Sequence, residues 1–395
     1  MMRIPEFLIP ELDDETIDKM ASVIVHCMNF KRGESALISS GLHTWRLVDM
    51  VRLRCAEQGV TSSADLTTDE FSRAYVEQMP IDFLQKPSRE MTAIANTTDA
   101  HINISRSWDP NFAARLPKEK TVAQREAVKE IQKIINRRNV RRVGVGYPTT
   151  PMAKSFGVTF EELKDLIVGG MLYSQRLLLE KCEALARHLR GADKIRLQDR
   201  DGTDLIVGIR ERRISMSDGL ISDEDRSIGY NTANLPTGEV FIAAHEEFGE
   251  GSLFCPLTRD RFTNKIIRNS LLLFKEGRLL LEECSAEQGE EELKTSLELS
   301  LKSDERRYDV VRTLNIGELG LGLNEMIKRP IGYILTDEKI GGSAHIAIGD
   351  NRAYGGTSDS SLHWDFVTGT KEQVTVIYPD GSQKSLVEDG RIVIM

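Results

Sequence analysis

The sequence predicts a two-domain protein in which an α/β domain, with a mostly parallel sheet and helices on both faces, precedes a larger strand-rich α+β domain. Its 395 residues exceed the roughly 100–200 residues of one ordinary domain. Helical and extended patterns alternate over the first 110 residues, as in a layered α/β unit. From Ala192 onward apolar residues recur with a period of two, which is typical of strands. We therefore expect domains at residues 1–115 and 116–395.

The first 110 residues predict helix, strand, helix and strand in that order. Apolar residues recur at helical spacing between Asp13 and Met28, behind acidic residues that favour a helix start, and the apolar run SALIS follows at 36–40. A second helix is expected from about His43 to Gln58, because Gly59 ends it. The extended run at 101–104 adds a further strand to the sheet.

The middle of the chain predicts the domain junction and two long helices. A proline and several basic residues interrupt the pattern between Pro110 and Lys120, and an amphipathic helix follows. Strand-like VGVGYP comes next, at 143–148. Thr159 and Glu162 have the spacing of a capping box, which predicts a helix that ends near Arg190.

The remaining residues predict mainly strands and hairpins. The turn Asp199–Gly202 separates two extended runs, which indicates a hairpin. Further extended runs are expected at 239–244, 270–282, 331–335, 345–349, 373–378 and 391–394.

Composition excludes several classes of protein. The chain is 40% hydrophobic and 29% charged, as soluble globular proteins are, and no stretch reaches the roughly 20 apolar residues that span a bilayer. A net charge of −9 and only a short basic cluster argue against a nucleic-acid partner. The N-terminus lacks the apolar core of a secretory signal, so we expect a cytoplasmic protein. Five scattered cysteines without a C-x-x-C pair indicate buried thiols.

The sharpest local signal for chemistry is the triplet His363-Trp364-Asp365. Residues two apart on a strand point to the same face, so this imidazole and carboxylate could bind one metal ion. A hydrogen-bonded surface pair is the alternative interpretation of the triplet.

Three other residues extend this candidate site. His345 lies in the apolar run HIAIG, before a loop rich in Gly and Asp, although a buried core histidine would also fit this pattern. Glu239 and Glu318 lie in apolar or Gly-rich segments, where an ionised carboxylate is unfavourable without a cation. Imidazole and carboxylate ligands together suit zinc, cobalt, manganese or ferrous iron, and five ligands suffice for two bridged ions.

Motifs for other chemistries are missing from the sequence. It contains no G-x-S-x-G, no H-E-x-x-H, no Walker A loop and no G-x-G-x-x-G. His245-Glu246-Glu247 begins like a zincin helix, but no second histidine follows, so we expect a loop beside Glu239.

Several segments of the chain resemble the thermophilic-type metallo-aminopeptidases, the family of aminopeptidase T and aminopeptidase S. The matching segments are NLPTGEVFIAAH (234–245), IGELGLG (316–322), AHIAIG (344–349), AY (353–354) and SLHWDFVTGT (361–370). The resemblance covers nearly the whole chain and is strong over 230–370. It implies a metal-activated water that hydrolyses the peptide bond at a free N-terminus.

The resemblance also implies roles for individual residues. It assigns Glu239, Glu318, His345, His363 and Asp365 as ligands of two divalent ions, and Tyr354 as a residue that stabilises the oxyanion. Members of the family carry a glutamate a few residues before the histidine matched by His345, where this chain has IGGSA. The nearest acid is Glu338, and we expect either Glu338 or an unidentified carboxylate to act as general base.

Two other functions stay open from the sequence. The chain has a distant resemblance to the dihydroxypyridine ring-cleaving dioxygenases, which also use an H-x-D pair and hold one ferrous iron. A non-catalytic binding member of the same fold is the third possibility, although five intact ligand positions count against it. The peptidase interpretation implies a peptide substrate, no nucleic-acid or membrane partner, and a homodimer.

Overall fold

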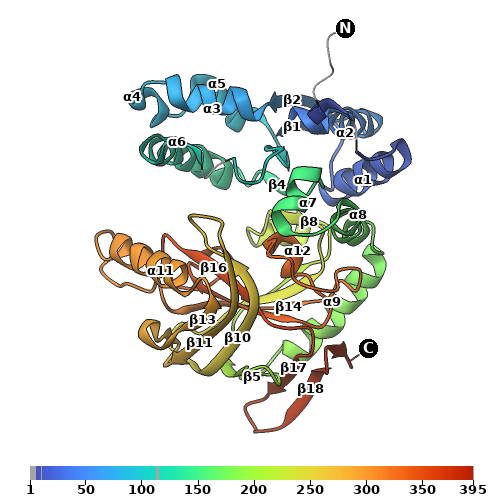
Figure 1. Ribbon diagram of the computed structural model, residues 1–395. Coiled ribbons are helices and arrows are strands. Elements are labelled where there is room, and N and C mark those ends of the chain that lie inside the picture. The colour runs from blue at the N-terminus through green and yellow to red at the C-terminus, as the bar shows by residue number, and fades with distance from the viewer. Residues whose placement is uncertain (1–5, 10, 113–114, 395) are drawn as a thin grey trace. The chain divides into compact units, whose positions relative to one another are not determined.

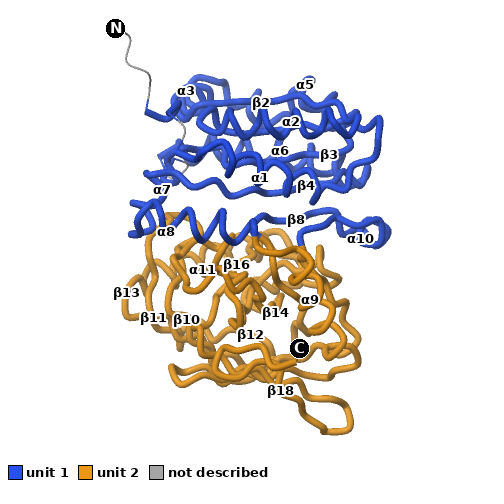
Figure 2. Tube along the Cα trace, turned by 90° about the vertical axis from the view of Figure 1, so that its right-hand side faces the viewer, with its two compact units in different colours: residues 1–172, 219–236 blue, residues 173–218, 237–395 orange. Residues whose placement is uncertain are grey.

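The computed structural model describes residues 6–9, 11–112 and 115–394 (Figure 1). The chain divides into two compact units, one made of residues 1–172 and 219–236 and the other of residues 173–218 and 237–395 (Figure 2). This division differs from the expected junction at residue 115, because two strands beyond that residue, β4 and β8, pair within the N-terminal sheet.

Unit 1 contains a five-stranded sheet in which every neighbouring pair is parallel. In sheet order the strands are β2 (Thr61–Thr67), β1 (Ser35–Gly41), β3 (Ala100–Ile104), β4 (Arg141–Val145) and β8 (Thr232–Leu235). Ile38, Ile102 and Val143 lie opposite one another on three adjacent strands and are fully buried. This apolar row is what a sheet covered on both faces requires.

Helices flank this sheet, with α1 and α2 on one side and α3 to α6 on the other (Figure 1). The α-helices of unit 1 are α1 (Asp14–Cys27), α2 (Trp45–Glu57), α3 (Asp69–Gln78), α4 (Ile81–Leu84), α5 (Arg89–Thr97), α6 (Lys118–Arg137), α7 (Thr150–Phe156), α8 (Phe160–Lys164) and α10 (Asp223–Ser227). Short 3-10 turns lie at Glu6–Leu8 and Leu42–Thr44, and a π-helical turn lies at Asp165–Gly169. The predicted α/β architecture is confirmed.

Local signals explain where these helices begin. The Asp13 carboxylate accepts the backbone N–H of Thr16 at 2.8 Å and caps α1. The capping box of Thr159 and Glu162 is present at α8. The predicted continuous helix to Arg190 is wrong, however, because the helical turns after α8 end before a new cap at Ser174 starts α9.

Unit 2 consists of antiparallel strands in two sheets that share one core. The larger sheet has the order β12-β11-β10-β6-β5-β17-β18-β19, with β13 also paired to β11. Its strands are β5 (Lys194–Gln198), β6 (Asp204–Gly208), β10 (Gly249–Arg259), β11 (Ile266–Lys275), β12 (Arg278–Leu279), β13 (Ser285–Gln288), β17 (Gln373–Ile377), β18 (Gln383–Glu388) and β19 (Arg391–Ile392). The predicted hairpin around Asp199–Gly202 is β5 and β6.

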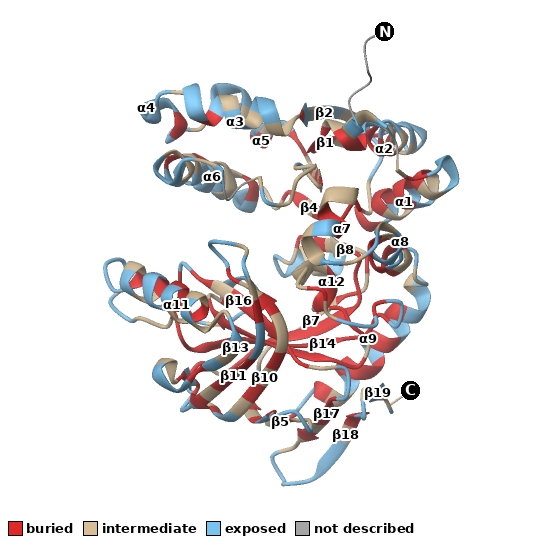
Figure 3. Cartoon of the chain, viewed as in Figure 1, coloured by how far each residue is buried: buried red, intermediate tan, exposed pale blue. Residues whose placement is uncertain are grey.

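The smaller sheet of unit 2 has the order β16-β15-β14-β9-β7. Its strands are β7 (Ile214–Ser217), β9 (Glu239–Ala243), β14 (Ile316–Gly322), β15 (Ala344–Gly349) and β16 (His363–Val367). Every residue of β9, β14 and β15 is buried, as the red strands of Figure 3 show. These strands are therefore covered on both faces, which explains their continuous apolar sequences.

Few helices accompany these strands. They are α9 (Gln175–Leu189), α11 (Glu290–Asp304) and α12 (Ile334–Asp337), with 3-10 turns at Leu281–Glu283 and Arg352–Tyr354. The predicted strand at 331–335 is wrong. Gly332 has a left-handed φ of +79°, and the Asp337 carboxylate accepts the backbone N–H of Ile331 at 3.1 Å, so this segment turns into α12.

Two sequence predictions about the whole chain have structural counterparts. All five cysteines are buried. No helix in the described ranges combines the length and the apolar character needed to cross a membrane.

Candidate metal centre

The smaller sheet of unit 2 carries all five predicted ligands on one face. Glu318 pairs with Ala347, and Ala347 pairs with Asp365 on the next strand. His345 pairs with Gly320, two residues after Glu318 in β14. Since paired residues and residues two apart share a face, these side chains converge.

The remaining two predicted ligands follow the same register. Glu239 pairs with Gly322 on one side of β14, and His363 pairs with Gly349 on the far side of β15. Residues more than a hundred positions apart in the sequence thus meet because four neighbouring strands place them in adjacent rows.

Glycine at position 320 makes room for an imidazole ring. A Cβ atom added there would lie closer than 3.0 Å to Cε1 and Nε2 of His345, nearer than real Cβ atoms approach. The Gly-rich sequence of β14, IGELGLG, therefore makes room for the His345 ring and also carries Glu318.

One potential ligand group consists of Glu318, His363 and Asp365, whose ligand atoms all lie within 4.8 Å of one another. His363 Nε2 lies 3.3 Å from Asp365 Oδ1 and 3.7 Å from Glu318 Oε2. His363 Nδ1 lies 2.8 Å from the backbone oxygen of Asp350. Because a carbonyl only accepts, Nδ1 carries a proton, and in the neutral ring Nε2 is the nitrogen left for an ion.

A second potential group consists of Glu239, Glu338 and His345, within the same 4.8 Å limit. His345 also joins the two groups, because its Nε2 lies 3.5 Å from Glu318 Oε1 and 3.8 Å from Glu239 Oε2. The structure therefore brings Glu338 among the ligand atoms, whereas the sequence suggested only a general base there. Glu338 does not lie directly before His345 in the sequence, but its position at the end of α12 brings the two side chains together.

Several buried ligand-type atoms in these groups have no hydrogen-bond partner within the described residues. They are Glu239 Oε2, Glu318 Oε2 and both ring nitrogens of His345. Buried polar atoms normally have partners, so this concentration of exceptions fits a cation-binding site. Oxygen and imidazole nitrogen are ligand types that suit zinc, cobalt, manganese and ferrous iron.

The electrostatics of the first group show strong coupling between imidazole and carboxylate. Burial alone would lower the pKa of His363, but the Asp365 carboxylate outweighs it and raises that pKa to about 10. Burial would raise the pKa of Asp365, and His363 reverses this and lowers it far below the usual range. His345 behaves similarly, since Glu318 and Glu239 overcome burial and raise its pKa to about 9. The carboxylates thus create a strong local demand for positive charge.

Lys339, which no sequence pattern singled out, lies within the second group. Its side chain is fully buried, and its Nζ lies 2.9 Å from Glu239 Oε1 and also pairs with Glu338 Oε1. Burial lowers the pKa of this ammonium, but Glu239 and Glu338 outweigh burial and raise it. Glu239 itself has a raised pKa because it is buried.

Tyr354 lies beside the first group. Its ring centroid is 5.7 Å from that of His363 and 5.2 Å from that of Phe241. Burial and the nearby carboxylates raise the pKa of the phenol well above its usual range. Tyr354 therefore keeps its proton at neutral pH and can donate a hydrogen bond.

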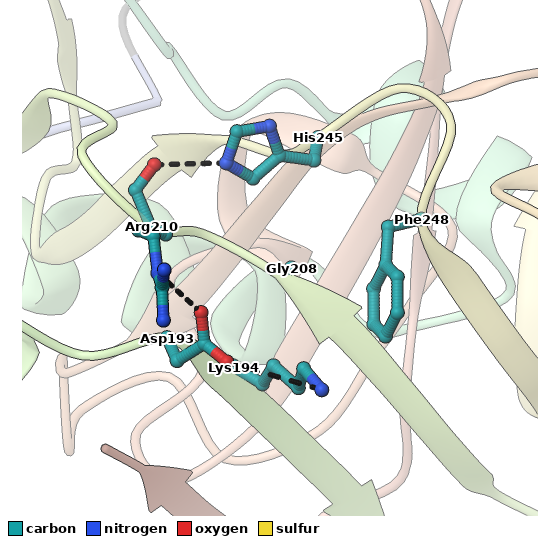
Figure 4. Close-up of a pocket in the computed structure, with 6 residues that line it drawn as sticks. All are labelled: Asp193, Lys194, Gly208, Arg210, His245 and Phe248. Carbon is teal, nitrogen blue, oxygen red and sulfur yellow. Dashed lines mark hydrogen bonds and ion pairs between the residues drawn. The ribbon is translucent and has the colours of Figure 1, made fainter. Parts of the chain in front are cut away.

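His245 lies outside both ligand groups. Its Nε2 is 2.8 Å from the backbone oxygen of Arg210, in a pocket of 330 Å³ lined by Asp193, Lys194, Gly208, Arg210, His245 and Phe248 (Figure 4). The following Glu246 accepts hydrogen bonds from Asn351 Nδ2 at 2.9 Å and from the backbone N–H of Thr357 at 2.6 Å. His245 and Glu246 thus stabilise loops.

Comparison with known sequences reveals relatives over nearly the full length. Aminopeptidase T of Thermus thermophilus is 25% identical over 434 residues, which covers 96% of this chain and 98% of that protein. Aminopeptidase T of Thermus aquaticus is 29% identical over 211 residues, covering 49% of this chain and 47% of its own length.

Solved structures with the same fold have lower sequence identity. Wild-type AmpT from Thermus thermophilus superposes with a TM-score of 0.74 at 20% identity, covering 96% of this chain and 99% of that one. The 2,5-dihydroxypyridine dioxygenase from Pseudomonas putida KT2440 superposes with a TM-score of 0.61 at 13% identity, covering 97% and 99%. At these identities the likeness concerns the fold.

A family model also matches almost the whole chain. The model of the thermophilic metalloprotease (M29) family matches residues 13–392. The match includes the four strands that carry the candidate ligands. The chain therefore belongs to the thermophilic metalloprotease (M29) family.

Proposed function

We propose that this chain is a metal-dependent aminopeptidase that removes N-terminal residues from peptides. Membership of a metalloprotease family supports hydrolysis, and the full-length relative named aminopeptidase T supports the position of cleavage. The observation that carries the proposal is the convergence of Glu318, His345, His363 and Asp365 with several buried ligand atoms that lack hydrogen-bond partners in the described residues.

Glu318, His363 and Asp365 would hold a divalent ion, with His345 as a further candidate ligand. When bound, such an ion supplies Lewis acidity and lowers the pKa of a coordinated water towards neutrality. Zinc, cobalt or manganese would suit this mixture of oxygen and nitrogen ligands. Of the two ions expected from the sequence, the one at this group suffices to support hydrolysis.

The other residues of the site would position substrate and protons. Glu338 is the carboxylate best placed to take a proton and pass it to the leaving amine, because it is held near His345 by Lys339. Tyr354 would donate a hydrogen bond from its hydroxyl to the carbonyl oxygen as negative charge develops there. The carboxylates would also attract the positively charged amino group of a peptide.

Metal analysis and a peptidase assay on the same preparation test this proposal. We expect metal-loaded protein to release a chromophore from aminoacyl substrates with a free amino group, and to leave N-acetylated versions intact. His363→Ala should abolish both metal binding and cleavage, whereas His245→Ala should retain both, because His245 lies outside the ligand groups. Undiminished metal content in the His363→Ala variant would overturn the proposed site.

A ring-cleaving dioxygenase is the second candidate function. The superposition on 2,5-dihydroxypyridine dioxygenase and the suitability of His345, His363 and Asp365 for ferrous iron support it. Oxygen uptake with a hydroxylated pyridine by the iron-loaded protein, without peptide cleavage, would replace the peptidase proposal. Protein that binds no metal and turns over neither substrate would instead indicate a non-catalytic binding member.

Three further expectations accompany the proposed function. Zinc as the native metal, a cytoplasmic location and a homodimer each stay predictions. Light scattering of the purified protein would measure the mass of the assembly, for which a homodimer of the 44.4 kDa chain gives twice that value.

A further inference from the structure

The second ligand group contains a cation that belongs to the chain itself. Of the lysines in the described part of the chain, two are buried, Lys181 and Lys339. Lys181 pairs with Glu325 and Tyr173, neither of which belongs to a ligand group. Lys339 is fully buried and pairs with Glu239 and Glu338, two of the three residues of the second group.

We infer that the ammonium of Lys339 takes the place of the second metal ion, so that the chain holds one divalent ion and not two. This inference rests on the metal site of the proposed function and concerns how many ions that site accepts. The lysine would fill the position between Glu239 and Glu338 in the second ligand group.

The contacts of the carboxylate oxygens support this assignment. Lys339 uses Oε1 of Glu239 and Oε1 of Glu338. The partnerless oxygen of Glu239 is Oε2, which faces His345 Nε2 at 3.8 Å. His345 Nε2 in turn lies 3.5 Å from Glu318 Oε1. The carboxylate oxygens that Lys339 leaves unpaired therefore lie on the side of His345 and Glu318, next to the first group.

Repulsion between the ammonium and a second ion also favours a single ion. Glu239, Glu318, Glu338 and Asp365 carry four negative charges when ionised, and histidines that bind a metal are neutral. Lys339 with one divalent ion leaves the cluster with one net negative charge. Lys339 with two divalent ions would leave one net positive charge in a buried place, with the ammonium and the second ion repelling each other across shared carboxylates.

The backbone keeps Lys339 in this position. The N–H of Lys339 donates to the oxygen of Thr336 at 2.9 Å, and the oxygen of Lys339 accepts the N–H of Asn324 at 3.0 Å. Gly322 allows this close approach, because a Cβ there would lie 2.8 Å from the carbonyl carbon of Lys339. The backbone of Lys339 is thus held between α12 and β14, and its side chain is fully buried against the two carboxylates.

Metal stoichiometry of the full-length chain tests the inference directly. We would dialyse the protein against excess cobalt or zinc, remove loosely bound metal, and measure bound metal by mass spectrometry and by the visible absorption of cobalt. Wild-type protein should hold one equivalent. Lys339→Met, which keeps an unbranched side chain and removes the charge, should hold two, and Lys181→Met is the matched control that should still hold one.

Each outcome distinguishes the inference from the proposed function. Two tight equivalents in wild-type protein, or one in folded Lys339→Met, would overturn the inference and leave the peptidase proposal standing. No bound metal in wild-type protein would overturn the proposed metal site itself. If Lys339→Met does not fold, the wild-type stoichiometry and that of Lys339→Gln decide the matter, with circular dichroism to confirm that each variant is folded.

Discussion

Replacing Gly320 with alanine should displace His345 from the candidate metal site. The glycine has no left-handed φ, so alanine suits the backbone of β14, and the conflict is with the neighbouring ring alone. The new Cβ would lie closer than 3.0 Å to Cε1 and Nε2 of His345 and 3.0 Å from its Nδ1.

The size of this conflict sets the expected effect. Carbon atoms in contact sit roughly 3.5–4.0 Å apart, so the ring must move by roughly 1.5 Å. Ligand distances in metal sites tolerate only about 0.2 Å, and His345 is fully buried and cannot compensate by swinging outwards. We expect Gly320→Ala to weaken metal binding at least about 10- to 100-fold, the range found when even the residues that support a ligand are removed.

A competition titration against a chromophoric chelator would measure this loss. Gly369→Ala is the matched control, because a Cβ there meets only Asp201 Oδ2 at 3.8 Å. His345→Ala should weaken binding at least as much as Gly320→Ala, and the double variant should be no weaker than His345→Ala, since both changes act on one ligand. Wild-type affinity in Gly320→Ala would show that His345 does not bind the metal.

Three further predictions concern charge and stability. Burial raises the pKa of Glu372 to about 9, so its folded state binds a proton that the unfolded chain releases above its ordinary pKa of 4.5, and stability should fall as the pH rises between these values. In urea unfolding, the free energy of unfolding of Glu372→Gln should therefore rise relative to that of wild type by up to about 1.4 kcal/mol per pH unit between pH 5 and 8. Parallel pH profiles of this free energy in the two proteins would contradict the prediction. For Glu246 the pKa shift has the opposite sign. Burial opposes ionisation, but Thr357, Asn351 and Arg212 outweigh burial and lower the pKa of Glu246 to about 2. The stabilisation that Glu246 contributes is therefore present above about pH 4.5 and is lost towards pH 2. The free energy of unfolding of Glu246→Gln should be up to about 3 kcal/mol below that of wild type at pH 7, and this difference should shrink on acidification. A difference that does not depend on pH would refute the ionic explanation. Removing metal with a chelator should lower the melting temperature of wild-type protein and leave that of His363→Ala unchanged, because an ion that binds only the folded state stabilises it by about 2.7 kcal/mol at a hundred times its Kd. Equal shifts in both proteins would place the bound metal elsewhere.

The sequence predicted those parts of the fold and site that depend on short-range periodicity. His363 and Asp365 stand two apart on a strand, and the apolar runs around Glu318 and His345 marked buried strands, so these residues could be selected before their partners were known. That all of them lie on one face follows from strand pairing, which joins segments far apart in the chain. Their roles as ligands stay predictions until metal is measured.

The features that the sequence did not reveal share a dependence on distant contacts. Lys339 follows a helix of four residues, and a charged residue at such an end normally lies in solvent, so nothing local indicates that two carboxylates bury it. Strand β2, TSSADLT, is polar and largely exposed at the edge of its sheet, so it lacks the apolar signature of a strand. The unit boundary was expected too early because nothing near residue 115 reveals that β8 joins the same sheet.

The chain passes directly from β8, which belongs to unit 1, to β9, the strand of unit 2 that carries Glu239. A ribosome that has released residues 1–172 has produced four strands of the parallel sheet and leaves the edge of β4 open until Leu235 emerges. Glu239, the first candidate ligand, follows only four residues later, and every other candidate ligand is still to be made. The strand that completes the N-terminal sheet and the first strand with a candidate ligand are therefore separated by only three residues. Deletions or insertions between Leu235 and Glu239 should consequently disturb both units, although they fall in no strand.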